Sequence, residues 1–372
     1  MKRETSKRLK EIRESGEEIY SISRLDCINH CLYEAYRTYK LHDRGKDNAY
    51  SREGGVVHDV LEGITKGTHT EADLLPAIQE ELDTMDMLGI EFPKGRDGSD
   101  VIRDGWVADM EHFAKTYVRP KRRRLVAEEE FLFETPSGHH LVGYIDLQRI
   151  YKDGSIDIFD YKTSSLYKGD DLKAHQRQLI VYAMGKEQEG IRVRSCSWIF
   201  LKYVEVTFTG YKTVKSKEKS EITKVIERRK IGAELEKHIT REMEEKGYDP
   251  IDIELVMDKF KASNMVDDLP ENIRSNYLVK PYVLKAELTE ETRQECLDYI
   301  ESTIKMWESL GNDERNYPPK SFTKLQKNGK SVPDYFYDTS LCGHFDNCPY
   351  IHDYLEQLET MKQGQNDEDD LF

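Results

Sequence analysis

The feature that most constrains the fold is a run of three β-strand patterns between residues 126 and 164. The segments EEEFLFET, HHLVGYIDLQRIY and SIDIFDYKTS combine β-branched or aromatic residues with partial alternation, and Pro-Ser-Gly and Lys-Asp-Gly turn signals separate them. Residues 170–188 return to helical spacing, and CSWIFLKYVEVTF indicates a fourth strand. Since helical patterns precede the meander and another helix interrupts it, we expect an α/β fold, a mixed central sheet flanked by helices.

The composition divides the chain into six segments. A charged extension (1–20), expected to be solvated, precedes a helical region (21–125) whose first helix we expect Ser23 to cap. A strand-rich core (126–210) and a charged helical insertion with few apolar residues (211–280) follow. The remainder comprises residues 281–355, with a helix from Thr289 to Ser309, and an acidic tail (356–372) for which we expect disorder.

The second hairpin of the meander carries charged residues where an apolar face is expected. Asp160 and Lys162 are two residues apart on a strand, so their side chains point to the same side while Tyr161 points to the other. A three-residue loop, 152–154, places Asp146 directly opposite Asp160. A two-residue turn would turn Asp146 away, so the prediction requires the longer loop or a bulge.

Two carboxylates on neighbouring strands make an oxygen-rich site of the kind that binds Mg²⁺ or Mn²⁺. A metal there can lower the pKa of a bound water, and a lysine beside it can orient that water or neutralise charge developing on a phosphate. An exposed Asp–Lys pair without function is the alternative interpretation. The hairpin by itself does not decide between the two.

The order GGVVHDVLE, GYIDLQRI, DIFDYKTS and HQRQLIVYA resembles the RecB-type branch of the PD-(D/E)XK nucleases, which includes the CRISPR-associated iron-sulfur exonucleases. The resemblance runs from about Ser21 to Tyr350 and implies a restriction-endonuclease-like core over residues 126–210. It also implies a metal-dependent nuclease that acts on DNA.

The resemblance further implies a role for each matching position. His58 of the G-x-x-H turn matches a metal-ligating histidine that comes from a helix packed beside the sheet, and Asp146 matches the first acidic ligand. Asp160 and Lys162 match the second ligand and the catalytic lysine, and the carbonyl of Tyr161 is an expected extra ligand. Gln178 and Tyr182 match a Q-x-x-x-Y motif near the site and the DNA. Glu128 and Glu130 are candidates for a supporting role outside the ligand set.

Four of the six cysteines cluster near the chain ends, as Cys27 with Cys31 and Cys342 with Cys348. In the iron-sulfur members, one upstream and three downstream cysteines bind a [4Fe-4S] cluster, but Thr339 stands here at one of the downstream positions. Cys27 is the substitute we expect, one helical turn before Cys31. Zinc bound by the same thiolates and unliganded cysteines remain alternatives. Cys196 and Cys296 are expected in the core.

The net charge of −15 argues only weakly against a DNA-binding protein, because such enzymes bind phosphates through local patches. The segment RPKRRR (Arg119–Arg124) is such a patch, or else a solvated charge run. The apolar runs are too short for membrane spans and the N-terminus is charged, so we expect a cytoplasmic protein.

The leading hypothesis is a Mg²⁺- or Mn²⁺-dependent exonuclease on single strands or duplex ends, acting in recombination, repair or replication. A non-catalytic DNA-binding or scaffold module with the same fold is the main alternative, and a structural metal protein is a third. The chain lacks a G-x-x-x-x-G-K-[ST] motif, so unwinding would require a partner helicase. A single-strand-binding protein is another possible partner.

Overall fold

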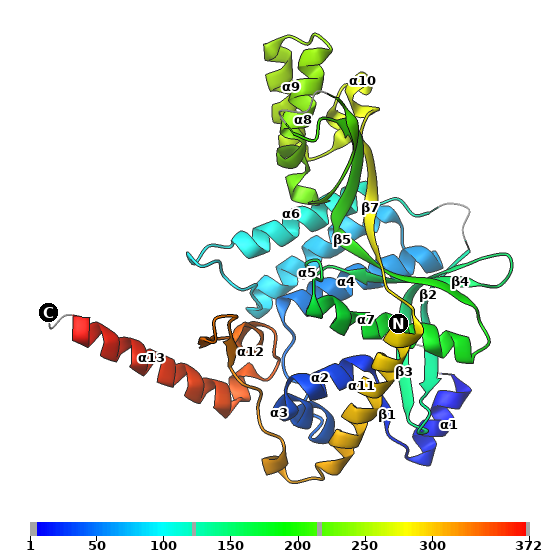
Figure 1. Ribbon diagram of the computed structural model, residues 1–372, viewed down its shortest axis with the longest axis vertical. Helices are drawn as coiled ribbons and strands as arrows, with labels where there is room; N and C mark the ends of the chain where they lie inside the picture. The colour runs from blue at the N-terminus through cyan, green and yellow to red at the C-terminus, as the bar shows by residue number, and fades with distance from the viewer. Residues whose placement is uncertain (1–5, 121–123, 214–217, 370–372) are drawn as a thin grey trace.

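A computed structural model describes residues 6–120, 124–213 and 218–369 (Figure 1). Its main sheet is mixed, with strands in the order β1-β3-β4-β5-β6, β2 beside β3 and β7 beside β5. The strands are β1 (Ile19–Tyr20), β2 (Arg124–Glu134), β3 (His140–Ile150), β4 (Ile156–Lys162), β5 (Val193–Gly210), β6 (Ser220–Glu227) and β7 (Leu278–Lys285). Helices cover both faces of this sheet. The expected α/β class and the restriction-endonuclease-like arrangement are confirmed.

The N-terminal region departs from the prediction in two places. Helix α1 (Lys7–Ser15) is not merely solvated, because Leu9 and Ile12 are buried against Leu132 of β2. Helix α2 (Ile22–His30) is capped by Ser21, whose side chain accepts a hydrogen bond from a backbone N–H, and not by the predicted Ser23. Either serine suits a cap, and the extended backbone at position 21 decides between them.

The chain leaves the helical path at Cys31, which has an extended backbone (φ −149°, ψ 110°) between α2 and α3 (Leu32–Ala35). A π-helical turn, Tyr36–Lys40, follows. The prediction that Cys27 and Cys31 share the face of one continuous helix is therefore wrong.

Three helices cover one face of the sheet: α4 (Ala49–Lys66), α5 (Leu74–Leu88) and α6 (Val101–Thr116). Helix α4 begins at Ala49, where Asn48 and Ser51 form a reciprocal capping box. His58 lies inside this helix, as the resemblance implied. The other face is covered by α2, α7 (Asp170–Gln188) and α11 (Glu290–Ser309), around a core that contains Trp198 and Trp307.

The predicted register of the second hairpin is confirmed. The β3–β4 ladder runs from Ile150↔Ile156 to Leu147↔Phe159 without a shift, so the next position sets Asp146 opposite Asp160. Gly154 has φ 79° and closes a turn with Tyr151, whose N–H bonds to the carbonyl of Ser155. The strands are therefore joined by the three-residue loop 152–154, which the prediction that Asp146 lies opposite Asp160 required.

The insertion differs most from its prediction. It contains strand β6 where a helix was expected, then α8 (Ile231–Glu245), α9 (Pro250–Ser263), α10 (Glu271–Arg274) and β7. It also has a hydrophobic core of its own, which includes Ile231, Leu235, Ile239, Met257 and Phe260. Strand β5 pairs with β4 in its first half and with β6 in its second half, so one long strand joins the insertion to the core (Figure 1).

The C-terminal region contains the two-stranded sheet β8 (Thr323–Leu325) and β9 (Ser331–Pro333), then α12 (Phe336–Ser340). Helix α13 (Pro349–Asp369) extends away from the body of the protein in Figure 1. The expected disordered tail is thus helical up to Asp369. In the described part of the chain, every helix is too short or too polar to cross a bilayer.

Candidate metal centre

Three carboxylates form a row across neighbouring strands β2, β3 and β4. Ala127 pairs with Leu147 and Glu129 with Ile145, so Glu128 stands opposite Asp146 on one side. Asp160 stands opposite Asp146 on the other side. Side chains at directly opposed positions of adjacent strands are close enough to interact.

His58 approaches this row from helix α4. Its Nδ1 lies 3.4 Å from Oδ2 of Asp146, and ligand atoms of His58, Glu128 and Asp146 all lie within 4.8 Å of one another. Burial by itself would lower the pKa of His58, but the hydrogen bond and charge of Asp146 outweigh it and the pKa is raised. One imidazole and two carboxylates thus converge on one small volume.

Glu128 reaches this group through an uncommon backbone conformation. It is a non-glycine residue with φ 53°, in the left-handed region, which costs roughly 1–2 kcal/mol for an L-residue. The ladder of β2 and β3 is interrupted there, between Ala127 and Glu129. Glu128 was expected to have only a supporting role, whereas the structure places its carboxylate beside His58 and Asp146.

The sequence does contain a signal for Glu128, because the length of the first turn sets the register of β2 against β3 and places Glu128 opposite Asp146. The first hairpin also closes through three residues, 136–138, since the N–H of Thr135 bonds to the carbonyl of His139. Glu130, two residues farther along, instead accepts hydrogen bonds from the backbone of Ser6 and lies outside the row. Of the two glutamate candidates, only Glu128 lies at the site.

Asp160 and Lys162 form a second part of the site, on the side of α7. Nζ of Lys162 lies 2.8 Å from Oδ2 of Asp160. Burial raises the pKa of Asp160 to about 6, although the lysine acts against that shift. Burial would lower the pKa of Lys162, but Asp160 outweighs it and the pKa of Lys162 is raised, so the ammonium stays charged.

Helix α7 holds this lysine through two polar side chains. Nζ of Lys162 donates to Oε1 of Gln178 at 3.1 Å, and Nε2 of Gln178 donates to the hydroxyl of Tyr182 at 2.8 Å. Both helix residues face the site, as the i, i+4 spacing predicted. The ammonium of Lys162 can only donate, so it fixes the amide of Gln178 with Oε1 toward the lysine and Nε2 toward the tyrosine hydroxyl.

Tyr161 contributes through its backbone. Its N–H donates to Oδ2 of Asp146 at 2.8 Å, which orients that carboxylate. Its ring is buried on the opposite face, in the core under α4–α6. The backbone N–H of Tyr161 is thus hydrogen-bonded to Asp146, which is one of the expected metal ligands.

A cleft of about 540 Å³ opens beside the metal site, and His58, Glu128, Asp146, Gln178 and Tyr182 line it. Two glycines allow close packing there. A Cβ on Gly54 would lie 3.3 Å from Oγ1 of Thr163, and one on Gly143 would lie 2.4 Å from the ring of Phe131. The site is thus open to a ligand, while the helix and strand behind it fit tightly.

The four terminal cysteines lie in one region, where α2 meets the C-terminal segment. All six cysteines are free thiols. Burial is the main cause that raises the pKa of Cys27. The charges of neighbouring groups, which include Cys31 and Cys342, raise it further. Backbone N–H groups point at the sulfurs of Cys31 and Cys348. Cys196 and Cys296 are buried in the main core, as expected.

The basic segment before β2 is only partly described, since residues 121–123 lie outside the described ranges. Arg119 forms hydrogen bonds within the protein. Its Nη2 donates to the carbonyl of Thr65, and its backbone N–H donates to the carboxylate of Glu71. His344, which follows Cys342 in the chain, forms a hydrogen bond through Nε2 with the hydroxyl of Thr38.

The model of the PD-(D/E)XK nuclease superfamily matches residues 19–317. No curated protein matches the sequence. Among solved structures, the one described as "Crystal structure of SSO0001" is 11% identical, with 86% of this chain and 94% of that chain covered and a TM-score of 0.27. The family match includes every element that contributes a side chain to the metal site.

Proposed function

Because the chain belongs to the PD-(D/E)XK nuclease superfamily, we propose that it is a deoxyribonuclease of the RecB-type branch that uses Mg²⁺ or Mn²⁺ and degrades DNA from its ends. The observation that carries this proposal is the row of Glu128, Asp146 and Asp160, with His58 beside Asp146 and Lys162 beside Asp160. A buried carboxylate that pairs with a lysine beside an open cleft is typical of functional sites.

The donor set fits a divalent metal. Glu128, Asp146 and Asp160 supply oxygen atoms, His58 supplies a nitrogen, and we assign the carbonyl of Tyr161 as a further ligand. A metal bound there would lower the pKa of a water and stabilise negative charge on a phosphate. Tyr161 N–H would keep the carboxylate of Asp146 turned toward it.

Lys162 is the residue that we assign to the reacting phosphate. Its ammonium remains charged and would donate to an oxygen on which negative charge develops. Gln178 and Tyr182 are positioning residues, because they limit the directions available to Nζ of Lys162.

The decisive experiment uses end-labelled single- and double-stranded DNA with Mg²⁺, with Mn²⁺ and with EDTA. We expect cleavage that EDTA abolishes and that falls by a factor of about 10³ or more in Lys162→Ala. Lys173→Ala changes an exposed lysine on the same helix as Gln178 and serves as the control. Metal-dependent cleavage that survives unchanged in Lys162→Ala would overturn the site assignment.

The preference for ends has a separate test. Linear and covalently closed circular single strands of the same sequence are compared under the same conditions. We expect degradation of the linear form only, whereas cleavage of circles would make the enzyme an endonuclease. We expect such ends to arise in recombination, repair or replication, where a helicase or a single-strand-binding protein would present them.

We also propose that Cys27, Cys31, Cys342 and Cys348 bind a [4Fe-4S] cluster that links the two chain ends. Four free thiols from both ends and the N–H groups directed at two of the sulfurs support this assignment. Tetrahedral zinc needs sulfurs about 3.8 Å apart, given Zn–S bonds of ~2.3 Å. Among the described residues no three cysteine sulfurs lie within 4.8 Å of one another, so these thiols are not already arranged for tetrahedral zinc.

The cluster is tested by anaerobic purification and a visible spectrum. A broad absorbance near ~400 nm is expected for a cluster of this type, lost in Cys348→Ser and kept in Cys196→Ala. A colourless protein with one zinc per chain would replace this proposal by the zinc alternative.

A further inference from the structure

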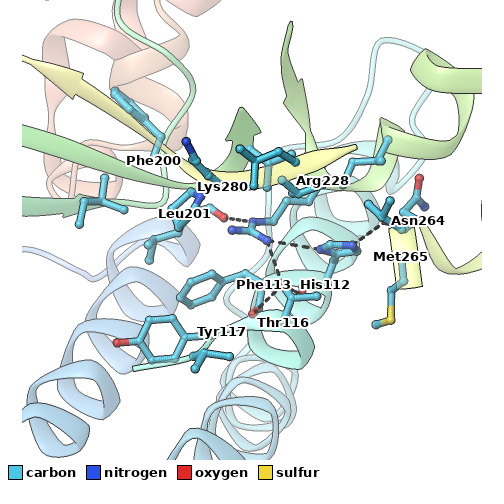
Figure 2. A pocket seen from close by; sticks show the side chains of 18 of the residues that line it. His112, Phe113, Thr116, Tyr117, Phe200, Leu201, Arg228, Asn264, Met265 and Lys280 are labelled. Atoms are coloured by element: carbon cyan, nitrogen blue, oxygen red, sulfur yellow. Dashed lines mark hydrogen bonds between the residues drawn. The ribbon is translucent and has the colours of Figure 1, made fainter. Parts of the chain in front are cut away.

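A second cavity, of about 840 Å³, lies between helix α6 and strands β5 and β7, where the insertion joins the core (Figure 2). It is separate from the cleft at the metal centre, and the two have no lining residue in common. Its walls are mainly apolar, with the aliphatic residues Leu147, Ile199, Leu201 and Val283 and the aromatic residue Phe113 among them. A volume of this size is typical of small-molecule sites.

One charged side chain is buried in this apolar setting. Arg228 is 5% exposed, although it follows strand β6 in a charged part of the chain. Its Nε donates to the carbonyl of Leu201 at 2.6 Å, and its Nη1 donates to Oγ1 of Thr116 at 3.0 Å. Figure 2 shows the guanidinium held between α6 and the sheet, with the ring of Phe113 below it.

The remaining contact of the guanidinium is also with a neutral group. Nε2 of His112 lies 2.9 Å from the carbonyl of Asn264, which can only accept, so the proton of the ring is on Nε2. Nδ1 is therefore an acceptor, and it lies 3.5 Å from Nη1 of Arg228. Burial lowers the pKa of His112 to about 4, which keeps the ring uncharged at neutral pH.

The positive charge of Arg228 thus has no carboxylate partner among the described residues. The charge of Asp109 acts on Arg228 without an ion pair between them, because Asp109 accepts from the backbone of Arg229 and pairs with the guanidinium of Arg229. At the rim, Asp267 is paired with Arg274. A buried cation without a counter-ion is costly, and a bound anion would offset that cost.

We infer that this cavity binds a small amphipathic organic anion, an aliphatic carboxylate whose chain lies against the apolar wall and whose head group pairs with Arg228. The second terminal nitrogen, Nη2, makes no hydrogen bond to the described residues and is available to the ligand. Aliphatic and aromatic side chains together make up most of the wall, which suits an acyl chain, whereas a nucleobase also requires directional polar partners.

The test measures binding of decanoate, decanol, decyltrimethylammonium and deoxyadenosine monophosphate to the full-length protein by isothermal titration calorimetry. We expect decanoate to bind about tenfold or more tightly than the neutral or cationic chains. Arg228→Met should remove this preference, whereas Lys280→Gln, at the rim, should keep it. Equal binding of all three chains, or tighter binding of the nucleotide, would overturn the inference.

A second variant covers the case in which Arg228→Met does not fold. Val283 is 42% exposed on strand β7 and lines the cavity, so Val283→Trp fills the space without disturbing the buried cation. We expect it to weaken decanoate binding about tenfold or more while DNA cleavage is retained. Unchanged decanoate binding would place the ligand elsewhere and contradict the inference.

Discussion

At the scale of single residues, Glu128 has the most unusual backbone of the site. Glu128 adopts a left-handed backbone conformation, which is strained for glutamate and would be unstrained for glycine. We expect Glu128→Gln to weaken Mn²⁺ binding by about 10- to 100-fold, measured by calorimetry, because it removes a charged ligand beside His58 and Asp146. Glu130→Gln, two residues away and bonded to Ser6, should bind Mn²⁺ normally. Equal affinity in the two variants would remove Glu128 from the ligand set.

Gln178 offers a test of positioning as distinct from metal binding. We expect Gln178→Leu to lower kcat by about tenfold while KM and Mn²⁺ affinity change little, because Lys162 loses the acceptor that directs it. Gln178→Glu keeps that acceptor and should recover much of kcat. A parallel loss of Mn²⁺ affinity would show that the residue acts on the metal instead.

Glu53 links stability to pH. It is fully buried in α4, and no described donor reaches either carboxylate oxygen. Burial and then Glu81 raise its pKa to about 8. The folded state therefore binds this proton more tightly than the unfolded chain, so the stabilisation is complete below pH ~4.5 and is lost as the pH rises through about 8.

Glu53→Gln tests this dependence because it keeps the shape and removes the titration. We expect the variant to have a higher Tm than the wild type at pH 9 and a similar Tm at pH 5, by differential scanning calorimetry. A Tm difference that is the same at both pH values would contradict the assignment.

At the scale of elements, the three-residue turn of the second hairpin fixes the relation between Asp146 and Asp160. Gly154 has φ 79°, so Gly154→Ala should destabilise the protein by about 1–2 kcal/mol. Gly55→Ala is the opposite case, because Gly55 lies within α4 and a Cβ there meets nothing within 4 Å. It should stabilise by about 0.5–1 kcal/mol. Urea denaturation of both variants measures the change in the free energy of unfolding, which should be negative for Gly154→Ala and positive for Gly55→Ala.

Local patterns predicted most of the elements near the site. Strands β2 to β5 and helices α7 and α11 lie where alternation, spacing and caps indicated them. The failures have local causes. Helical spacing of Cys27 and Cys31 is broken by an extended residue, and strand β6 lies in a charged segment whose composition favours a helix. Its pairing with β5 decided the outcome.

At the scale of the whole molecule, the insertion and the core share strands β5 and β7 but have separate apolar cores. Phe260 is fully buried in the insertion, and Phe260→Ala should cost about 3–5 kcal/mol. We expect the loss to be local, so amide exchange should rise in α8 and α9 while α7 remains protected. Uniform exchange throughout the chain would show that the two cores unfold as one unit.

The sequence by itself determined the fold class, the register of the second hairpin and the presence of Gln178 and Tyr182 on one helix face. These follow from the two-residue period of strands, the length of a turn and the spacing of helices, all of which are local. Only the tertiary structure decided that His58 reaches Asp146, that Gln178 reaches Lys162, and that Arg228 is buried beside a cavity. Those outcomes depend on which helix crosses which strand, and no local period specifies it.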